Sequence, residues 1–360
     1  MTPAKYSATE IFQALIDYEQ KKFGQTKIFL PTPEQILIIE SDPTSPSVVI
    51  AGAGSGKTET MGARVLWLVA NGFVRPDEIL GLTFTRKAAG ELALRIRRRL
   101  RLLQKVKLLP VANNDNPIDL AVTVSTYHSY AGKIVSEHGI RMGIDSGTEP
   151  MGQAATWQII NDIVSNFETT DYELTHGVND IIKKVASLAG QIGEHASSTQ
   201  AVRDHALMQL EKLLTTNGRN DDVRLAITSL EEQISILPMV DQLDQYRRSN
   251  GTLSFDDQMS LAAELAVTFD EIGTNERSKY RIVLLDEYQD TSFGQVRFLS
   301  HLFKGGHPVT AVGDPNQAIY GWRSASPETI GNFPRHFPSA SGTPVVTYKL
   351  LTTFRNDEQV

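Results

Sequence analysis

Residues Val48–Thr58 read VVIAGAGSGKT, and this stretch decides the fold. A short apolar strand runs into a glycine-rich turn that ends in Lys57 and Thr58, and a helical stretch, Met61–Ala70, follows. Glycines let backbone N–H groups curl around phosphate oxygens, and the start of the next helix adds its dipole. Lysine here neutralises the β- and γ-phosphates, and the threonine hydroxyl ligates Mg²⁺. The strict pattern has glycine where this chain has Ala51, but the strand–loop–helix order still indicates a phosphate-binding loop. Its predicted members are Ala51, Gly52, Ala53, Gly54, Ser55, Gly56, Lys57 and Thr58.

A second motif, RIVLLDEYQDT at Arg281–Thr291, places two acids directly after an apolar strand. Ligands of open α/β sheets bind at the carboxyl ends of the strands, where Asp286 and Glu287 would lie. Asp286 would hold Mg²⁺, and Glu287 would polarise an attacking water. The alternative is an ordinary solvated acid pair. The preceding strand and the phosphate-binding loop together favour the catalytic role.

The order of apolar segments predicts an α/β fold with a parallel sheet. Three short apolar runs are each followed by a helical stretch: Val48–Ala51, Ile79–Thr85 and Ala121–Ser125. Spacing near 3.6 residues then indicates an inserted, mostly helical subdomain, and strands return at Arg281–Leu285 and Val309–Gly313. The predicted division is 1–30 (N-terminal helix and linker), 31–129 (first part of the core), 130–250 (helical insertion), 251–350 (second part of the core) and 351–360 (start of a further domain).

Composition bounds the class of protein. The 360 residues are 41% hydrophobic and 21% charged, which favours two compact globular units. The absence of cysteine excludes disulfides and thiolate metal sites and favours a reducing cytoplasm. No apolar run is long enough to span a membrane, so we expect no membrane partner.

The charge is unevenly distributed. Net charge is -7, which taken alone argues mildly against nucleic acid. Residues 81–107, however, hold nine lysines and arginines and a single acid, Glu91. Such a patch can contact phosphates while the rest of the surface stays acidic. The alternative is a solvated basic helix face.

Several motifs together resemble those of the UvrD/PcrA/Rep helicases of superfamily 1, in the same order and across nearly the whole chain. They are PTPEQ (Pro31–Gln35), LTFTRKAAGEL (Leu82–Leu92), STYHSY (Ser125–Tyr130), LSFDDQ (Leu253–Gln258), LLDEYQDT, VGDPNQAIYGWRSA (Val312–Ala325) and LTTFRND (Leu351–Asp357). Residues Glu59–Leu100 more narrowly resemble motor subunits of the AdnA/AdnB helicase–nuclease type.

The resemblance implies a RecA-like parallel core that uses ATP and Mg²⁺ to move along single-stranded DNA. It further implies 3′ to 5′ unwinding in DNA repair or recombination, with partners among single-stranded DNA, single/double-strand junctions and a second motor or nuclease subunit. The runner-up is a DNA-binding subunit whose ATP site is structural or regulatory. Intact Lys57, Asp286, Glu287 and Gln317 argue against that alternative.

The resemblance also assigns roles around the nucleotide. Gln35 would read adenine through an amide that donates and accepts, and Phe354 would stack on the base. Gln317 would sense the γ-phosphate, Arg355 would stabilise its charge, and Arg323 would link this site to DNA. One departure is Glu59, where several relatives carry an arginine near the adenine.

The resemblance also places aromatic side chains at positions that contact single-stranded bases in relatives, and any base can stack on an aromatic face. For each of them the alternative is core packing, and for His128 it is a polar role at a helix start. The predicted DNA contacts are Phe84, Arg86, Tyr127, His128, Tyr320, Trp322 and Arg323.

Arg355 lies five residues before the end of the sequence at Val360. The resemblance implies that ATP lies between two RecA-like halves, the second of which would begin near Phe354. We therefore expect this stretch alone to bind nucleotide and to hydrolyse it poorly.

Overall fold

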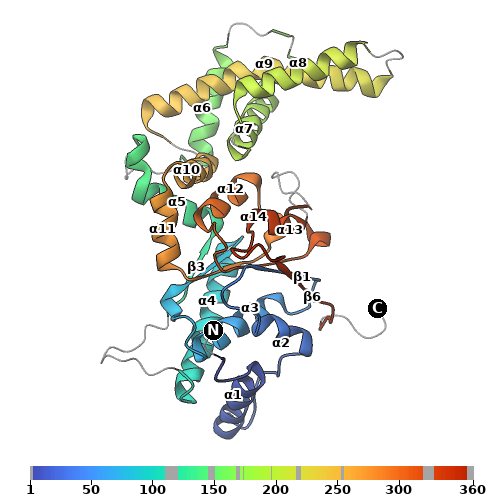
Figure 1. Cartoon of the computed structure of the whole chain (residues 1–360). Coiled ribbons are helices and arrows are strands. Elements are labelled where there is room, and N and C mark those ends of the chain that lie inside the picture. The colour runs from blue at the N-terminus through green and yellow to red at the C-terminus, as the bar shows by residue number, and fades with distance from the viewer. Residues whose placement is uncertain are drawn as a thin grey trace. The chain divides into compact units, whose positions relative to one another are not determined.

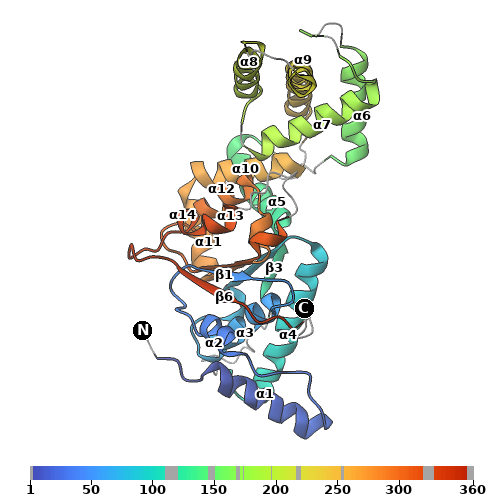
Figure 2. The same cartoon turned by 90° about the vertical axis from the view of Figure 1, so that its right-hand side faces the viewer.

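The computed structural model (Figures 1 and 2) describes residues 3–109, 121–144, 151–167, 171–172, 174–195, 197–215, 220–252, 255–318 and 328–354. The chain forms two compact units. The first comprises Met1–Tyr130, Ala266–Thr291 and Leu299–Val360, and the second comprises Ala131–Leu265 and Ser292–Phe298.

A six-stranded sheet forms the centre of the first unit, and all of its strand pairs are parallel. Its order is β3-β2-β4-β5-β1-β6, with Val49 of β1 opposite Val312 of β5 and Leu80 of β2 opposite Val283 of β4. The predicted α/β fold with a parallel sheet is therefore confirmed. The strands are β1 (Ser47–Ala51), β2 (Ile79–Thr83), β3 (Thr123–Thr126), β4 (Ile282–Leu285), β5 (Val309–Gly313) and β6 (Val346–Leu350).

Helices cover both faces of this sheet, which is why its central strands are buried throughout and read as continuous apolar runs. Helices α1 to α4 lie on one face, and α13 and α14 lie on the other (Figures 1 and 2). The helices of this unit are α1 (Ala8–Phe23), α2 (Pro33–Ile39), α3 (Lys57–Ala70), η1 (Pro76–Glu78), α4 (Arg86–Lys105), α11 (Asp270–Lys279), η3 (Tyr288–Asp290), η4 (Pro315–Gln317), α13 (Glu328–Gly331) and α14 (Phe333–His336).

Local signals explain where these helices begin. Ser7 and Thr32 start α1 and α2 with capping boxes. In each box the hydroxyl accepts the backbone N–H of the residue three positions on, and the side chain of that residue accepts the backbone N–H of the capping residue. Thr85 caps α4 by accepting the Ala88 N–H at 3.0 Å. Apolar side chains of α1, α3 and α4 then form one core with strands β1, β2 and β4, among them Ile11 and Ile96.

The second unit is helical, as the 3.6-residue spacing predicts. Its core joins α6, α7 and α9 through buried side chains that include Ile160, Val185 and Val240. Glu232, buried on α9, pairs with His176 at 2.6 Å and with Lys184 of α7. The remaining helices, three of which (α5, α10 and α12) also have residues in the first unit, are α5 (Tyr127–His138), η2 (Gly139–Met142), α6 (Gln153–Ser165), α7 (Val178–Glu194), α8 (Thr199–Thr215), α9 (Asp221–Asn250), α10 (Phe255–Thr268) and α12 (Phe293–Leu302).

None of the helices described here combines the length and apolar character needed to cross a membrane.

Candidate nucleotide-binding site

The carboxyl ends of all six strands lie at one edge of the sheet because the strands are parallel. The segments that leave β1, β4, β5 and β6 at this edge carry most of the predicted nucleotide contacts. In open α/β sheets this edge is where ligands bind. The fold therefore gathers motifs that lie up to about 300 residues apart in the sequence.

The loop after β1 has the backbone that a phosphate cradle requires. Gly54 and Gly56 have φ of +75° and +83°, values that side-chain-bearing residues rarely adopt. The Ser55 hydroxyl donates to the Gly52 carbonyl at 2.8 Å and closes the turn. Helix α3 then begins at Lys57, and no side chain caps the N–H groups of its first turn. Those N–H groups are free to bind an anion.

Lys57 and the two acids after β4 meet at this loop. The Lys57 Nζ lies 3.5 Å from the Glu287 Oε2, and the Lys57 side chain is 11% exposed. Asp286 is buried, and its pKa rises to about 6, first because of burial and then because of the neighbouring Glu287 charge. The structure thus brings together Lys57, Asp286 and Glu287.

A divalent cation fits this arrangement. A positive charge beside the buried Asp286 carboxylate would offset the cost of keeping it ionised. The Thr58 hydroxyl, on the first turn of α3, forms no hydrogen bond with any residue that the structure describes, so it is available as a ligand. The described residues contain no cluster of three or more His, Asp or Glu side chains that would suit a metal. Mg²⁺ held by Thr58 and Asp286 would take its other ligands from phosphate and water.

Glu287 has a strained backbone that aims its side chain. Its φ of +50° is unusual for a residue other than glycine, and such strain concentrates at functional sites. The Glu287 N–H donates to the Asp286 Oδ1 at 3.1 Å. The Gln289 Nε2 donates to the Glu287 Oε2 at 3.0 Å, the same oxygen that faces Lys57. These contacts fix the carboxylate relative to the loop.

Gln289 also ties β4 to β5. Its Oε1 accepts the Asp314 N–H at 3.0 Å, and its side chain is almost fully buried. A Cβ on Gly313 would lie 2.3 Å from this oxygen, so the end of β5 requires glycine. Gln317, on η4, donates to the Asp314 Oδ2 at 2.6 Å. Sequence reasoning did not single out Gln289, and the only signal for it was its place inside DEYQDT.

The predicted base contacts converge on Gly56. A Cβ at Gly56 would lie 2.9 Å from the Gln35 Nε2 and 3.8 Å from the Phe354 Cε2. The Phe354 N–H donates to the Gly54 carbonyl at 3.0 Å, while the Phe354 ring is 62% exposed. The Gln35 Oε1 accepts the Thr32 N–H at 3.0 Å, so in this structure the amide oxygen serves the helix cap and the amide nitrogen faces the loop.

Sequence reasoning missed Arg64, which is buried on α3. Its Nη1 donates to the Ile38 and Ile39 carbonyls at 2.9 and 3.2 Å and to the Ser41 carbonyl and hydroxyl at 3.1 and 2.6 Å, and its Nη2 donates to the Asp42 carbonyl at 3.2 Å. Burial lowers the pKa of this guanidinium to about 10. Arg64 thereby fastens the end of α2, which carries Gln35, to the helix that carries Lys57. Its one sequence signal is a lone charge inside an apolar helical run.

Glu59 lies in the first turn of α3. It forms ion pairs with Arg99 and, at 3.4 Å, with Arg95, both of α4. The chain therefore has a carboxylate held by two arginines of the neighbouring helix at this position.

The structure corrects one predicted DNA contact. Tyr127 is buried, and its hydroxyl donates to the Asp286 carbonyl at 2.9 Å, so its ring has no open face for a base. Burial also raises its pKa well above the usual value. Phe84 is half-buried edge-on to Tyr127 at a centroid distance of 6.5 Å, His128 is half-buried, and Arg86 is exposed at the start of α4. Tyr320, Trp322, Arg323 and Arg355 lie outside the described residues.

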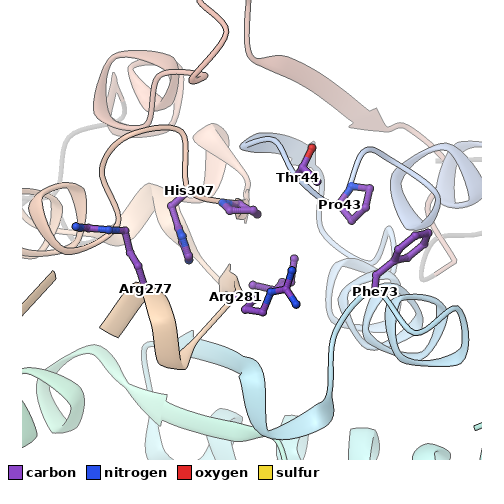
Figure 3. A pocket seen from close by; sticks show the side chains of 8 residues that line it. Pro43, Thr44, Phe73, Arg277, Arg281 and His307 are labelled. Atoms are coloured by element: carbon purple, nitrogen blue, oxygen red, sulfur yellow. The ribbon is translucent and has the colours of Figure 1, made fainter. Parts of the chain in front are cut away.

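A cavity of about 340 Å³ opens at the opposite edge of the sheet, where β4 and β5 begin (Figure 3). It contains none of the predicted nucleotide contacts, so we do not assign it to the nucleotide. Its lining residues are Pro43, Thr44, Phe73, Arg277, Arg281, Ile282, His307 and Pro308.

His307 at this cavity should make stability depend on pH. Its Nε2 contacts the Tyr280 carbonyl at 2.8 Å, its ring stacks on Phe303, and burial lowers its pKa from 6.5 to about 4. Between pH 6.5 and about 4, the His307 imidazole binds a proton in the unfolded chain but stays neutral in the folded chain. Lowering the pH through this range therefore lowers the free energy of unfolding. We expect this residue to account for about 2–3 kcal/mol of the loss between pH 7.5 and 4.5. Urea unfolding of His307→Asn at both pH values should show a loss smaller by that amount, and an equal loss would contradict the assignment.

Comparison with known proteins agrees with this geometry. Residues 32–338 match the UvrD/REP helicase N-terminal domain family. The chain is 30% identical over 325 residues to ATP-dependent DNA helicase UvrD2 of Mycobacterium tuberculosis, covering 88% of this chain and 40% of that protein. It is 26% identical to ATP-dependent DNA helicase PcrA of Leuconostoc citreum over 299 residues, covering 82% and 34%. It is 26% identical to a probable DNA helicase II homolog of Mycoplasma capricolum over 317 residues, covering 88% and 38%. The chain thus spans at most about two fifths of these relatives. With the phosphate-binding loop, the paired acids and this match over most of its length, the chain belongs to the UvrD/REP helicase family.

Proposed function

We propose that this chain is the ATP-binding part of a motor that couples ATP hydrolysis to movement along single-stranded DNA. The observation that carries the proposal is the meeting of Lys57 and Glu287 at 3.5 Å beside the buried Asp286, at the carboxyl edge of a parallel sheet. A cation, a base and a metal-ligating carboxylate are the groups that hydrolysis of a phosphoanhydride needs.

Each group has a distinct task in this proposal. The N–H groups of the Gly52–Gly56 loop and of the first turn of α3 would bind the phosphates, and Lys57 would neutralise their charge. Glu287, held by Gln289, would orient the attacking water and take its proton. Mg²⁺, held by Thr58 and Asp286, would supply positive charge next to the phosphates. Gln317 and Arg355 would respond to the γ-phosphate.

The base would lie beside Gly56, between Gln35 and Phe354. The Phe354 ring is exposed and available for stacking, and its backbone is anchored to the loop by the bond to Gly54. The Gln35 amide nitrogen faces the same space and would donate to an acceptor on the adenine ring.

DNA would cross the same edge of the sheet next to Phe84, Arg86 and His128, which follow β2 and β3. Tyr127 would couple DNA binding to the ATP site, because its hydroxyl donates a hydrogen bond to the backbone carbonyl of Asp286. Tyr320, Trp322 and Arg323 would add further contacts. From the family resemblance we propose 3′ to 5′ movement, unwinding of single/double-strand junctions in repair or recombination, and a second motor or nuclease subunit as partner. The cysteine-free composition supports the further proposal of a reducing, cytoplasmic location.

Lys57→Ala tests the nucleotide site. Loss of charge-assisted bonds worth about 1.5–3 kcal/mol should weaken binding of a fluorescent, slowly hydrolysed ATP analogue by roughly 10–100-fold. The folded state should persist, because Lys57 lies at the first position of α3 and contributes no apolar core contact. Anisotropy titrations of the variant and of Lys183→Ala, an exposed lysine of the second unit, provide the comparison. Equal affinity in wild type and Lys57→Ala, at matched helicity, would refute the assignment.

A further inference from the structure

The outer face of α4 carries four cations in a narrow arc. Arg97, Arg98, Arg101 and Lys105 are all exposed. With 3.6 residues per turn they fall within about 100° of one another around the helix. The buried residues of the same helix, among them Leu92, Ile96 and Leu100, lie on the opposite side and pack into the core. We call these four cations the α4 basic stripe.

The α4 basic stripe has no acidic partner within the part of the chain that the structure describes. Arg95 and Arg99, which flank the buried side of α4, are paired with Glu59 of α3. No residue that the structure describes forms an ion pair or hydrogen bond with any of the four stripe residues. Four unpaired cations within three turns repel one another at a cost, in a chain whose net charge is -7. That pattern fits a surface whose counter-ions come from a bound polyanion.

The α4 basic stripe lies away from the edge where the nucleotide and single-strand contacts gather. Helix α4 starts just after β2 ends, at Thr85 and Arg86, and then runs back along one face of the sheet (Figure 1). At 1.5 Å per residue, Arg97 lies about 16 Å and Lys105 about 28 Å along the axis from Arg86. A strand crossing the carboxyl edge beside Arg86 would therefore not cover the stripe.

The chemistry of α4 discriminates between the two forms of DNA. Sites for single strands combine cations with aromatic faces on which the bases stack. Helix α4 contains no aromatic residue along its whole length. Duplex DNA hides its bases and presents one phosphate charge per about 1.7 Å of axis, so a row of cations without aromatic neighbours matches it.

We propose that the α4 basic stripe binds the phosphate backbone of the duplex part of a single/double-strand junction, as a second DNA contact outside the single-strand path. This inference rests on the proposed function, since it takes DNA as the substrate. It adds a sequence-independent contact that would hold the duplex against the first unit.

The test is the quadruple variant Arg97→Gln, Arg98→Gln, Arg101→Gln and Lys105→Gln, which keeps good helix formers at exposed positions. Binding is followed by fluorescence anisotropy with a labelled single strand of about 10 nucleotides and with the same strand joined to a duplex, across a range of salt concentrations. Each lost phosphate contact lowers the slope of log K against log salt by about 0.9, so we expect the junction slope to fall by about 3–4. Affinity for the single strand should stay unchanged.

A matched control removes four exposed cations of the second unit through Lys183→Gln, Lys212→Gln, Arg224→Gln and Arg248→Gln. The control variant should keep the wild-type junction slope, which separates a local contact from net charge. If the stripe variant keeps the wild-type slope of log K against log salt on the junction, the stripe does not contact the duplex. An acidic protein surface would then be the expected partner of the stripe. Equal losses on the single strand and on the junction would also overturn the duplex contact, by placing the stripe on the single-strand path. A wild-type chain that binds no single strand would instead refute the proposed function.

Discussion

Replacing Glu287 with Gln is expected to slow ATP hydrolysis by about 10²–10⁴-fold while nucleotide binding is retained. The amide keeps the shape of the side chain but cannot accept a proton from water. It also removes the negative charge that faces Lys57 at 3.5 Å and that helps to raise the pKa of Asp286. Because one repulsive charge near the phosphates is lost, binding should be equal or tighter, so the defect is in the chemical step alone.

Single-turnover measurements with protein in excess over ATP suit this comparison, because they record hydrolysis even when it is slow. They should be made with and without single-stranded DNA. Glu78→Gln makes the same chemical change on η1, which precedes β2 and so lies at the amino edge, and should keep the wild-type rate. If Glu287→Gln hydrolyses ATP as fast as wild type, another group activates the water. If a longer chain that includes the second RecA-like half binds ATP and never hydrolyses it, the site is structural or regulatory.

The sheet could be predicted from sequence where its strands are buried on both faces. Strands β2, β4 and β5 are apolar at nearly every position, and each ends in a motif that fixes its direction. Strand β6 was not predicted. Among the described strands it lies at the edge of the sheet and pairs only with β1, and most of its residues are exposed, so its sequence VTYKL shows no buried pattern.

The site could be predicted where its chemistry is local. Lys57, Asp286 and Glu287 follow directly from the spacing of the phosphate-binding loop and from an acid pair after an apolar strand. The supporting contacts could not, because they join residues that are distant in sequence. The Tyr127 hydroxyl binds a carbonyl 159 residues away, and no local pattern distinguishes that buried ring from a base-stacking one. Arg64 satisfies carbonyls 22 to 26 residues earlier in the chain, across a strand and a loop.

Arg64→Met is expected to lower the free energy of unfolding by about 3–5 kcal/mol. Methionine fills much of the volume and avoids the cost of burying a charge, which is visible in the lowered pKa of Arg64. It leaves the carbonyls of Ile39, Ser41 and Asp42 without their guanidinium donor, however, and each unsatisfied buried acceptor costs about 1–3 kcal/mol. The Ile38 carbonyl keeps the Ser41 hydroxyl as a donor at 2.8 Å. The loss of hydrogen bonds therefore outweighs the relief of desolvation.

Urea unfolding of Arg64→Met, with the exposed Arg101→Met as control, measures this difference. The control should stay within about 0.5 kcal/mol of wild type.

Arg64 also holds α2, so the folded variant should lose affinity for ATP more than for pyrophosphate, which occupies the loop without reaching Gln35. Arg64→Lys keeps the charge and some of the donors, and should fall between wild type and Arg64→Met in both measurements. A loss below about 1 kcal/mol in Arg64→Met would mean that α2 is held by its apolar contacts. Equal losses of ATP and pyrophosphate affinity would mean that Arg64 supports the phosphate-binding loop and not the base-contacting helix.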